Sequence, residues 1–140
     1  MYLIFLSCRQ KACLNAQYNR QGGFFKKLTE IIYANITNEK FRVNDLAREM
    51  GMSRSNLHRK IKSLTGKSIS KFICVFRMEK AQELLIATPS SISDIAFECG
   101  FHSVTYFTKC YKDHYGHPPS DVRKHMFDVA ISEDRRICIL

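Results

Sequence analysis

The chain has 140 residues, 45% of them hydrophobic, which is enough to bury the core of one ordinary domain or two small ones and excludes wholesale disorder. Its 22 lysines and arginines exceed its 13 acidic residues, and the resulting charge of +9 favours a polyanionic partner, either nucleic acid or an anionic membrane surface. The opening run MYLIFL is too short for a signal peptide or a membrane span, and six irregularly spaced cysteines without a C-x-x-C pair indicate free thiols in a reducing cytoplasm.

The first part of the chain changes from an irregular segment to a helical one. Residues 1–23 show no sustained period and end in a Gly-Gly pair, so we expect a tail or linker there. From Phe24 onward apolar residues recur at three- and four-residue steps, which predicts an amphipathic helix with one buried stripe: Phe25, Leu28, Ile32 and Ile36.

Two shorter helices are predicted next. The segment VNDLAREMG, residues 43–51, should be capped by Asn44 and should end at Gly51 in the left-handed conformation. Ser53 is predicted to cap the second helix, RSNLHRKIKSLT, which should stop at Gly66.

The rest of the chain continues in helices. Ser68 should open a longer helix that runs to about Ala87, because the following Thr-Pro pair disfavours helix. A short helix, a turn and a longer helix then follow up to residue 116, and Pro118-Pro119 should begin a last helical turn or two. Residues 127–140 stay unassigned. The sequence therefore predicts an all-α protein with about seven helices.

The chain contains an internal repeat of two helical segments. Residues 43–51 match residues 92–100 at an offset of 49, and after the glycine one extra residue changes the offset to 50. The matched pairs in the second part are Ser53 with Ser103, Leu57 with Phe107, Arg59 with Lys109, Ile61 with Tyr111, Lys62 with Lys112 and Gly66 with Gly116. Each copy reads as helix, glycine turn and helix, which predicts two helix-turn-helix units whose second helices enter the major groove.

Helical geometry divides the second helix of each copy into two faces. The predicted core stripes are Leu57, Ile61 and Leu64 in the first copy, and Phe107, Tyr111 and His114 in the second. The opposite arcs are polar and cationic without a carboxylate, as a groove lined by phosphates and base edges requires: Ser55, His58, Arg59 and Lys62, and then Thr105, Thr108, Lys109 and Lys112.

A longer pattern resembles a known family. The pattern is Arg77-x3-Ala81-x2-Leu84-Leu85, then Ile92-x2-Ile95-Ala96-x3-Gly100-Phe101-x4-Tyr106-Phe107, then Gly116-x2-Pro119-x3-Arg123. It resembles the AraC/XylS family of bacterial transcription regulators over about residues 24 to 126. Two positions depart from the family pattern: Val122 replaces an aromatic residue, and Tyr111 replaces the more usual Phe.

The resemblance implies an architecture and a function. It implies helix-turn-helix subdomains at 24–67 and 88–126, a linker helix at 68–87, and tails at 1–23 and 127–140. It also implies binding of promoter double-stranded DNA, recruitment of RNA polymerase, usually for activation, a place at the bacterial nucleoid in the cytoplasm, and no cofactor. Family members normally carry a signal-receiving region, and residues 1–23 are too few for one. The chain is therefore expected to be a detached output module, a fragment or a small regulator, and a homodimer formed through a separate region is compatible with it.

The resemblance also implies DNA contacts, because each residue takes the role of its position in the family's motif. The base-reading positions are Ser55, His58, Arg59, Thr105, Thr108 and Lys109. The phosphate-contacting positions are Ser53, Arg54, Lys62, Ser103 and Lys112.

The same residues allow other interpretations. A metal site among Cys99, His102, Cys110, His114 and His117 is disfavoured, because the repeat places the first and fourth of these at core positions. A DNA-repair methyl-acceptor module would need four zinc-binding cysteines, and the tail offers only Cys8 and Cys13. No hydrolase triad is present, so no enzyme is expected. A non-specific architectural DNA-binding protein remains open, as does a basic amphipathic helix that binds protein or membrane.

Overall fold

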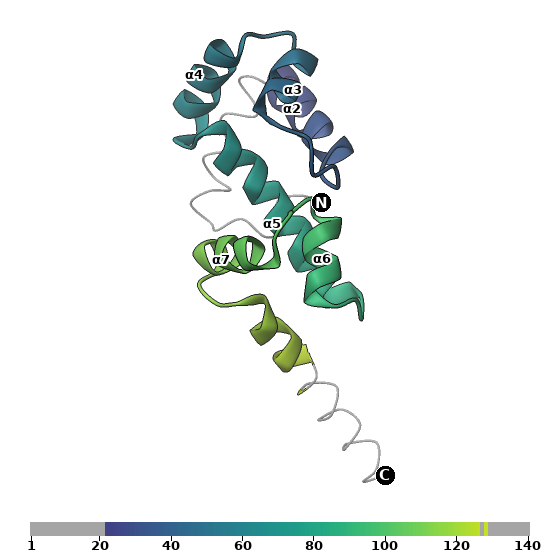
Figure 1. The fold of residues 1–140 in the computed structure, drawn as a ribbon. Helices are drawn as coiled ribbons and strands as arrows, with labels where there is room; N and C mark the ends of the chain where they lie inside the picture. The colour runs from purple at the N-terminus through teal and green to yellow at the C-terminus, as the bar shows by residue number, and fades with distance from the viewer. Residues whose placement is uncertain (1–21, 127, 129–140) are drawn as a thin grey trace. The chain divides into compact units, whose positions relative to one another are not determined.

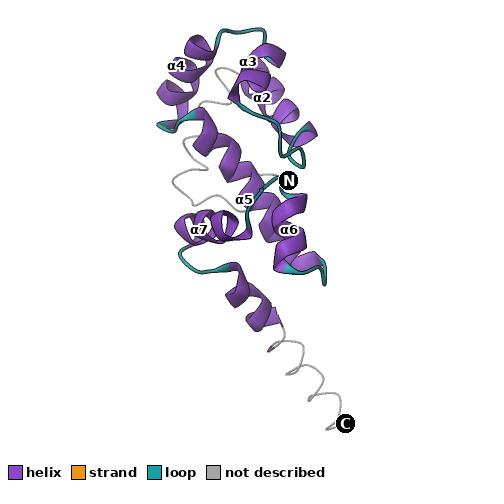
Figure 2. Cartoon of the chain, in the orientation of Figure 1, coloured by secondary structure: helices purple, strands orange, loops and turns teal. Residues whose placement is uncertain are grey.

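The computed structural model describes residues 22–126 and residue 128. These residues form α-helices and loops, and the described part of the chain contains no strand (Figures 1 and 2). The helices are α2 (Gly22–Ala34), α3 (Val43–Glu49), α4 (Arg54–Thr65), α5 (Ile69–Ala87), α6 (Ile92–Glu98) and α7 (Val104–Tyr115), followed by a helical segment over 119–126. The all-α prediction is confirmed, including the last turns after the two prolines.

The described residues fall into two compact units that divide inside α5. The first unit ends at Phe76 and the second begins at Arg77. Each unit contains one copy of the repeat, α3 and α4 in the first and α6 and α7 in the second. The turn between α6 and α7 is one residue longer than that between α3 and α4, which is where the offset of the repeat changes.

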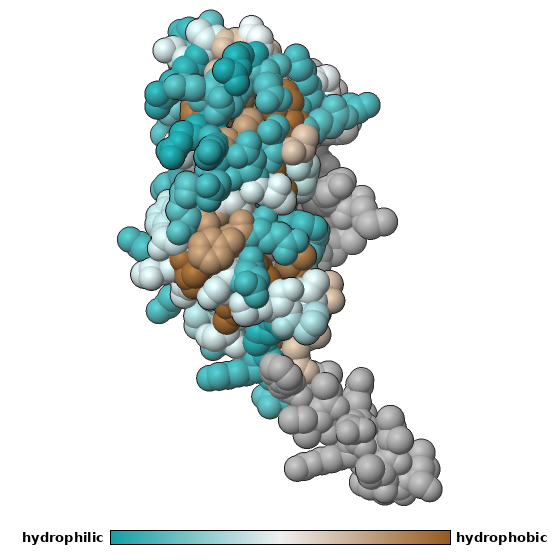
Figure 3. Space-filling view, turned by 45° about the vertical axis from the view of Figure 1, so that its right-hand side comes forward, coloured by the Kyte–Doolittle hydropathy of each residue, from teal (hydrophilic) through white to brown (hydrophobic). Residues whose placement is uncertain are grey.

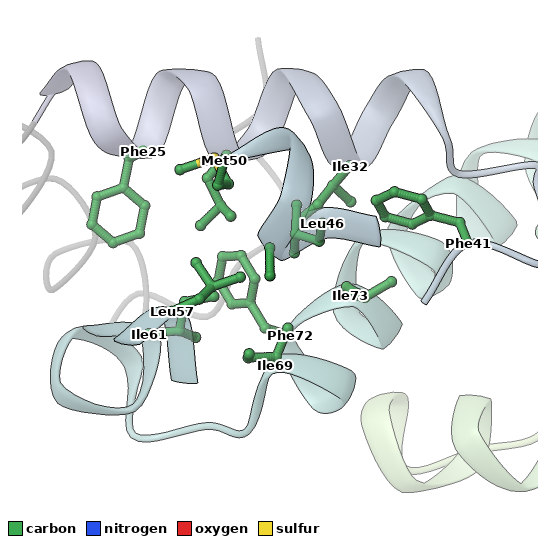
Figure 4. Packing of buried hydrophobic residues seen from close by; sticks show 12 residues of the cluster. Phe25, Ile32, Phe41, Leu46, Met50, Leu57, Ile61, Ile69, Phe72 and Ile73 are labelled. Carbon is green, nitrogen blue, oxygen red and sulfur yellow. The ribbon is translucent and has the colours of Figure 1, made fainter. Parts of the chain in front are cut away.

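The first unit is held together by apolar side chains from four helices. Leu28 and Ile32 of α2, Leu46 of α3, and Leu57 of α4 are fully buried. Figure 4 shows Ile69 of α5 beside Leu57 and Ile61, so the first turn of α5 lies against α4. Since these side chains come from segments far apart in the sequence, the core determines which face of α4 remains open to solvent.

The second unit has an aromatic core. Phe107 and Tyr111 of α7 are fully buried, and the ring of Phe107 lies 5.3 Å from that of Phe101 and 5.9 Å from that of Tyr111. The Tyr111 hydroxyl donates a hydrogen bond to the side-chain oxygen of Gln82 in α5. Burial raises the pKa of Tyr111 to about 12. The tyrosine that departs from the family pattern therefore has a partner for its hydroxyl.

Arg123 links the last helical segment of the second unit to an earlier loop of the same unit. Its guanidinium donates a hydrogen bond to the backbone carbonyl of Ser90, in the loop between α5 and α6. A charge-assisted bond of this kind joins the segment 119–126 to a loop 33 residues earlier. Val122, the other departure from the family pattern, is half-buried beside it.

Two predicted helix starts are corrected. Helix α3 begins at Val43, so Asn44 lies inside its first turn and does not cap it; the Asp45 carboxylate instead accepts the backbone N–H of Arg42 at 2.9 Å. The same arrangement recurs in the second copy, where Asp94 accepts the N–H of Ser91 at 3.3 Å. Helix α2 is described from Gly22, two residues before the predicted start.

Glycines end both second helices, as predicted for Gly66. Gly66 and Gly116 have φ values of 71° and 83°, in the left-handed region that glycine adopts without strain. Their N–H groups donate to the carbonyls of Lys62 and Lys112, each at 2.8 Å. The two copies of the repeat therefore end their second helices in the same way.

Candidate nucleic-acid interface

Helix α4 exposes the polar arc that the sequence predicts. Leu57 and Ile61 are buried, while Leu64 is only half-buried at the edge of the core. All the predicted contact positions on this helix and at its cap are exposed: Ser53, Arg54, Ser55, His58, Arg59 and Lys62. Because the helix carries no acidic residue, this face presents only cationic and neutral polar groups.

Helix α7 repeats this division with one difference. Ser103, Thr105, Lys109 and Lys112 are exposed, as predicted. Thr108 is half-buried, and its hydroxyl donates to the carbonyl of Val104 at 2.9 Å, so its oxygen and its methyl group are what remain for a ligand. His114, which was expected in the core stripe, is half-buried, because its position near the end of the helix corresponds to that of Leu64.

The capping serines have two roles that are compatible. The Ser53 hydroxyl oxygen accepts the N–H of Asn56 at 3.2 Å, and that of Ser103 accepts the N–H of Tyr106 at 3.3 Å. Each cap uses the oxygen as an acceptor and leaves the hydroxyl hydrogen to be donated. A serine at this position can therefore stabilise its helix and donate to an anion at once.

Arg59 is held in place by a residue that sequence reasoning missed. Its guanidinium donates to the side-chain oxygen of Asn56 at 2.6 Å, one helical turn earlier. Asn56 and Arg59 are three positions apart in the sequence, and this spacing indicates that their side chains can meet on a helix. On the other side of α4, the Lys60 ammonium lies 4.0 Å from the centre of the Phe24 ring, so this lysine points toward the core rather than with the polar arc.

The first unit has an open hollow between α4 and the start of α5. The residues that line it are Val43, Arg54, Ser55, His58, Arg59, Ser68, Ile69 and Ser70. Four of them were predicted as DNA contacts, so the fold brings those four together. Ser68 and Ser70 were not predicted, because the periodicity of α4 does not reveal which part of another helix packs beside it.

The thiols and imidazoles that were disfavoured as metal ligands lie in different environments. Cys99 is fully buried in the second core, Cys110 is half-buried, and His102 is exposed in the turn before α7. Within residues 22–126 and 128, no group of three or more His, Cys, Asp or Glu side chains is arranged to hold a metal ion. Cys8 and Cys13, considered for a methyl-acceptor module, lie outside the described residues.

Cys99 is expected to resist alkylation in the folded protein. Burial raises the pKa of its thiol to about 12, with the neighbouring Glu98 carboxylate adding to the effect, so little thiolate forms. Treatment with iodoacetamide at a pH of about 8, followed by peptide mass spectrometry, should label the half-buried Cys74 and Cys110 before Cys99. In urea all three should react alike. Equal labelling in buffer would contradict the buried placement.

The surface of the molecule differs between the units. On the face seen in Figure 3, hydrophilic residues cover most of the first unit. Among the described residues, the large apolar side chains that are exposed all belong to the second unit: Ile86, Phe97, Tyr106 and Met126. No helix in the described part of the chain is both long and apolar enough to cross a bilayer.

The chain is similar to proteins that bind DNA. A model of the helix-turn-helix domain family matches residues 46–125. A crystal structure of a transcriptional regulator with an AraC-type DNA-binding domain, from Chromobacterium violaceum, has a TM-score of 0.70 and 30% identity over 77% of this chain and 96% of that one. The DNA-binding domain of AdpA, a global transcriptional factor crystallised with a target DNA, has a TM-score of 0.63 and 29% identity over 71% of this chain and 91% of that one.

Curated relatives match over a limited part of their length. A protein named histidine kinase P4, from Formosa agariphila, is 37% identical over 95 residues, which are 68% of this chain and 7% of that protein. The xylose operon regulatory protein of Escherichia coli K12 is 37% identical over 82 residues, 59% of this chain and 21% of that protein. The chain thus spans less than a third of the length of these relatives.

Proposed function

The chain belongs to the AraC-type family of helix-turn-helix DNA-binding domains, a family of transcription regulators rather than enzymes, and on that premise we propose that it binds promoter DNA sequence-specifically and activates transcription. In this proposal the subdomains 24–67 and 88–126, joined by the helix at 68–87, each place a second helix in the major groove. RNA polymerase is the partner that activation requires, and the bacterial nucleoid is where the chain acts.

The observation that carries this proposal is the pair of exposed polar arcs. On α4 and α7 the side chains at the predicted contact positions are cationic or neutral, and they recur at equivalent positions of the repeat; α7 also carries one exposed carboxylate, Asp113, beside its arc. We assign base reading to Ser55, His58, Arg59, Thr105, Thr108 and Lys109, and phosphate contact to Ser53, Arg54, Lys62, Ser103 and Lys112.

Regulation by a signal is a further part of the proposal. The relatives are longer than the segment they share with this chain, and that segment carries the helix-turn-helix match. We infer that the segment is the output module of a regulator, to which a signal-receiving region supplies control.

Selection of bound duplexes from a random pool tests the function. The protein should enrich one sequence, protect it in a footprint over two major-groove segments, and prefer it to unrelated duplex at physiological salt. Enrichment of no sequence, with equal affinity for every duplex, would indicate an architectural protein instead. Binding to anionic vesicles but not to DNA would indicate a membrane-surface module.

Lys112→Ala should weaken binding to all duplexes to a similar extent. The exposed ammonium lies one turn beyond the base-reading positions of α7, where we assign it to phosphate. Loss of one phosphate contact should flatten the plot of log affinity against log salt by about one unit. The matched control is Lys80→Ala, because the Lys80 ammonium is already paired with Glu83 at 3.5 Å. A loss confined to one base pair would contradict the assignment.

A further inference from the structure

The hollow of the first unit brings together hydrogen-bond donors from two helices. Arg54 and Arg59 of α4 lie on its lining together with the hydroxyls of Ser55, Ser68 and Ser70. Among the lining residues, all of which the structure describes, there is no carboxylate. An arginine supplies a planar fork of N–H donors, and serine hydroxyls supply single donors, which together match the oxygens of a phosphodiester.

The core holds this arrangement in place. Ile69 is 2% exposed and packs in the same cluster as Leu57 and Ile61, so the start of α5 is anchored beside α4 (Figure 4). The neighbours of Ile69 in sequence, Ser68 and Ser70, then reach the hollow from the α5 side. The Ser68 oxygen accepts the N–H of Lys71 at 3.3 Å, which leaves its hydroxyl hydrogen to be donated.

The repeat shows that the second unit lacks two of these groups. At the offset of 50, Arg54 corresponds to Val104, Ser68 to Pro118, and Ser70 to Ser120. Ile69 corresponds to Pro119, which is also fully buried, so the apolar anchor recurs. The arginine and one of the hydroxyls do not recur, because valine and proline have no donor to offer in their side chains.

We propose that the hollow of the first unit binds one phosphodiester of the DNA backbone through Arg54, Ser68 and Ser70, and that the second unit has no equivalent contact. The proposal rests on the proposed function, since the phosphodiester is that of the bound duplex. Ser68 and Ser70 thereby become DNA contacts contributed by α5, outside both helix-turn-helix motifs. The first unit is then the more salt-sensitive half of the interface.

The test compares Ser70→Glu with Ser120→Glu, its counterpart in the second copy. A carboxylate in the first turn of a helix favours the helix dipole, so Ser70→Glu should keep the thermal unfolding midpoint of the wild type. Its carboxylate should nevertheless repel the phosphodiester, lowering affinity for the selected duplex by about tenfold or more and flattening the salt plot by about one unit. Ser120→Glu should change affinity by less than about threefold and leave the salt plot as it is, because no phosphate contact is lost.

A second measurement locates the phosphate. Duplexes that carry one uncharged methylphosphonate linkage at a time should include one that weakens the wild type but not Ser70→Glu, since the two changes remove the same contact. Arg54→Val, which installs the residue of the second copy, should be insensitive to the same linkage. Inorganic phosphate at matched ionic strength should displace the duplex no better than chloride does, because the ligand is the backbone and not a free anion.

The outcomes separate this proposal from the proposed function. If the wild type selects one sequence but Ser70→Glu binds it as the wild type does, or loses no more affinity than Ser120→Glu, the phosphate site is wrong and the regulator stands. If no sequence is selected, the proposed function is wrong. The affinities of Ser70→Glu and Ser120→Glu for any duplex still test whether the hollow binds a phosphodiester. If every linkage that weakens the wild type also weakens Ser70→Glu equally, the phosphate site is wrong as well.

Discussion

Phe107→Ala is expected to unfold the second unit while the first unit stays folded. Phe107 is fully buried, and its ring contacts the rings of Phe101 and Tyr111. Truncating a buried phenylalanine to alanine lowers the free energy of unfolding by about 3–5 kcal/mol. Because units of this size have a small free energy of unfolding, a loss of that magnitude removes most of it.

Hydrogen exchange followed by mass spectrometry measures the effect separately in each unit. In Phe107→Ala, peptides from residues 77–126 should exchange much faster, and peptides from residues 22–76 should exchange as in the wild type. Leu57→Ala is the matched control, because Leu57 is the counterpart of Phe107 in the repeat and is also fully buried. In Leu57→Ala, peptides from residues 22–76 should exchange much faster, and peptides from residues 77–126 should exchange as in the wild type. Faster exchange throughout the chain in either variant would show that the units unfold as one.

Arg59→Ala is expected to relax discrimination at one base pair. The exposed guanidinium can make a bidentate contact with guanine, and such a contact contributes roughly 1–3 kcal/mol to discrimination against the wrong base. In the free protein this group donates a hydrogen bond of 2.6 Å to Asn56, which orients it on the exposed face of α4. The measurement is the affinity of Arg59→Ala for duplexes that each differ from the selected site by one base pair. The variant should bind all four bases at the contacted position with similar affinity and keep the wild-type preference at every other position.

Two further variants separate base reading from charge. Arg59→Lys keeps the positive charge but loses the planar fork, so it should retain the salt dependence of binding and still lose the preference at that base pair. Lys60→Ala removes a cation of the same helix that lies over the Phe24 ring, and it should leave the preference unchanged. If Arg59→Ala instead weakened all duplexes alike, Arg59 would be a phosphate contact.

The periodic features of the chain could be predicted from local chemistry. The helix over RSNLHRKIKSLT has the bounds predicted for it, because Ser53 and Gly66 fix its ends within the segment itself. The buried stripe through Leu57 and Ile61 follows from apolar spacing alone. The predicted cap at Asn44 was wrong, because α3 begins at Val43 with Arg42 as its N-cap, and Asp45 accepts the Arg42 N–H from inside the first turn.

The candidate interface was predictable only where it lies on one helix. The outward positions on α4 and α7 follow from the angle between successive residues, and the structure exposes them all except Thr108, which is half-buried. Thr108 differs because a threonine in a helix can donate to a carbonyl one turn back, as it does to Val104. Ser68 and Ser70 had no periodic signal, because their approach to α4 depends on where Ile69 is buried.

The sequence by itself thus determined the helices, both ends of the helix from Arg54 to Thr65, the duplication and the face of each second helix that is free to bind. These depend on interactions between residues a few positions apart, which residue type and spacing record directly. Only the tertiary structure decided that the start of α5 lies beside Arg54, that Tyr111 donates to Gln82, and that Arg123 joins the last helical segment to the carbonyl of Ser90. Those contacts join residues distant in sequence, and burial of apolar surface in each core selects them.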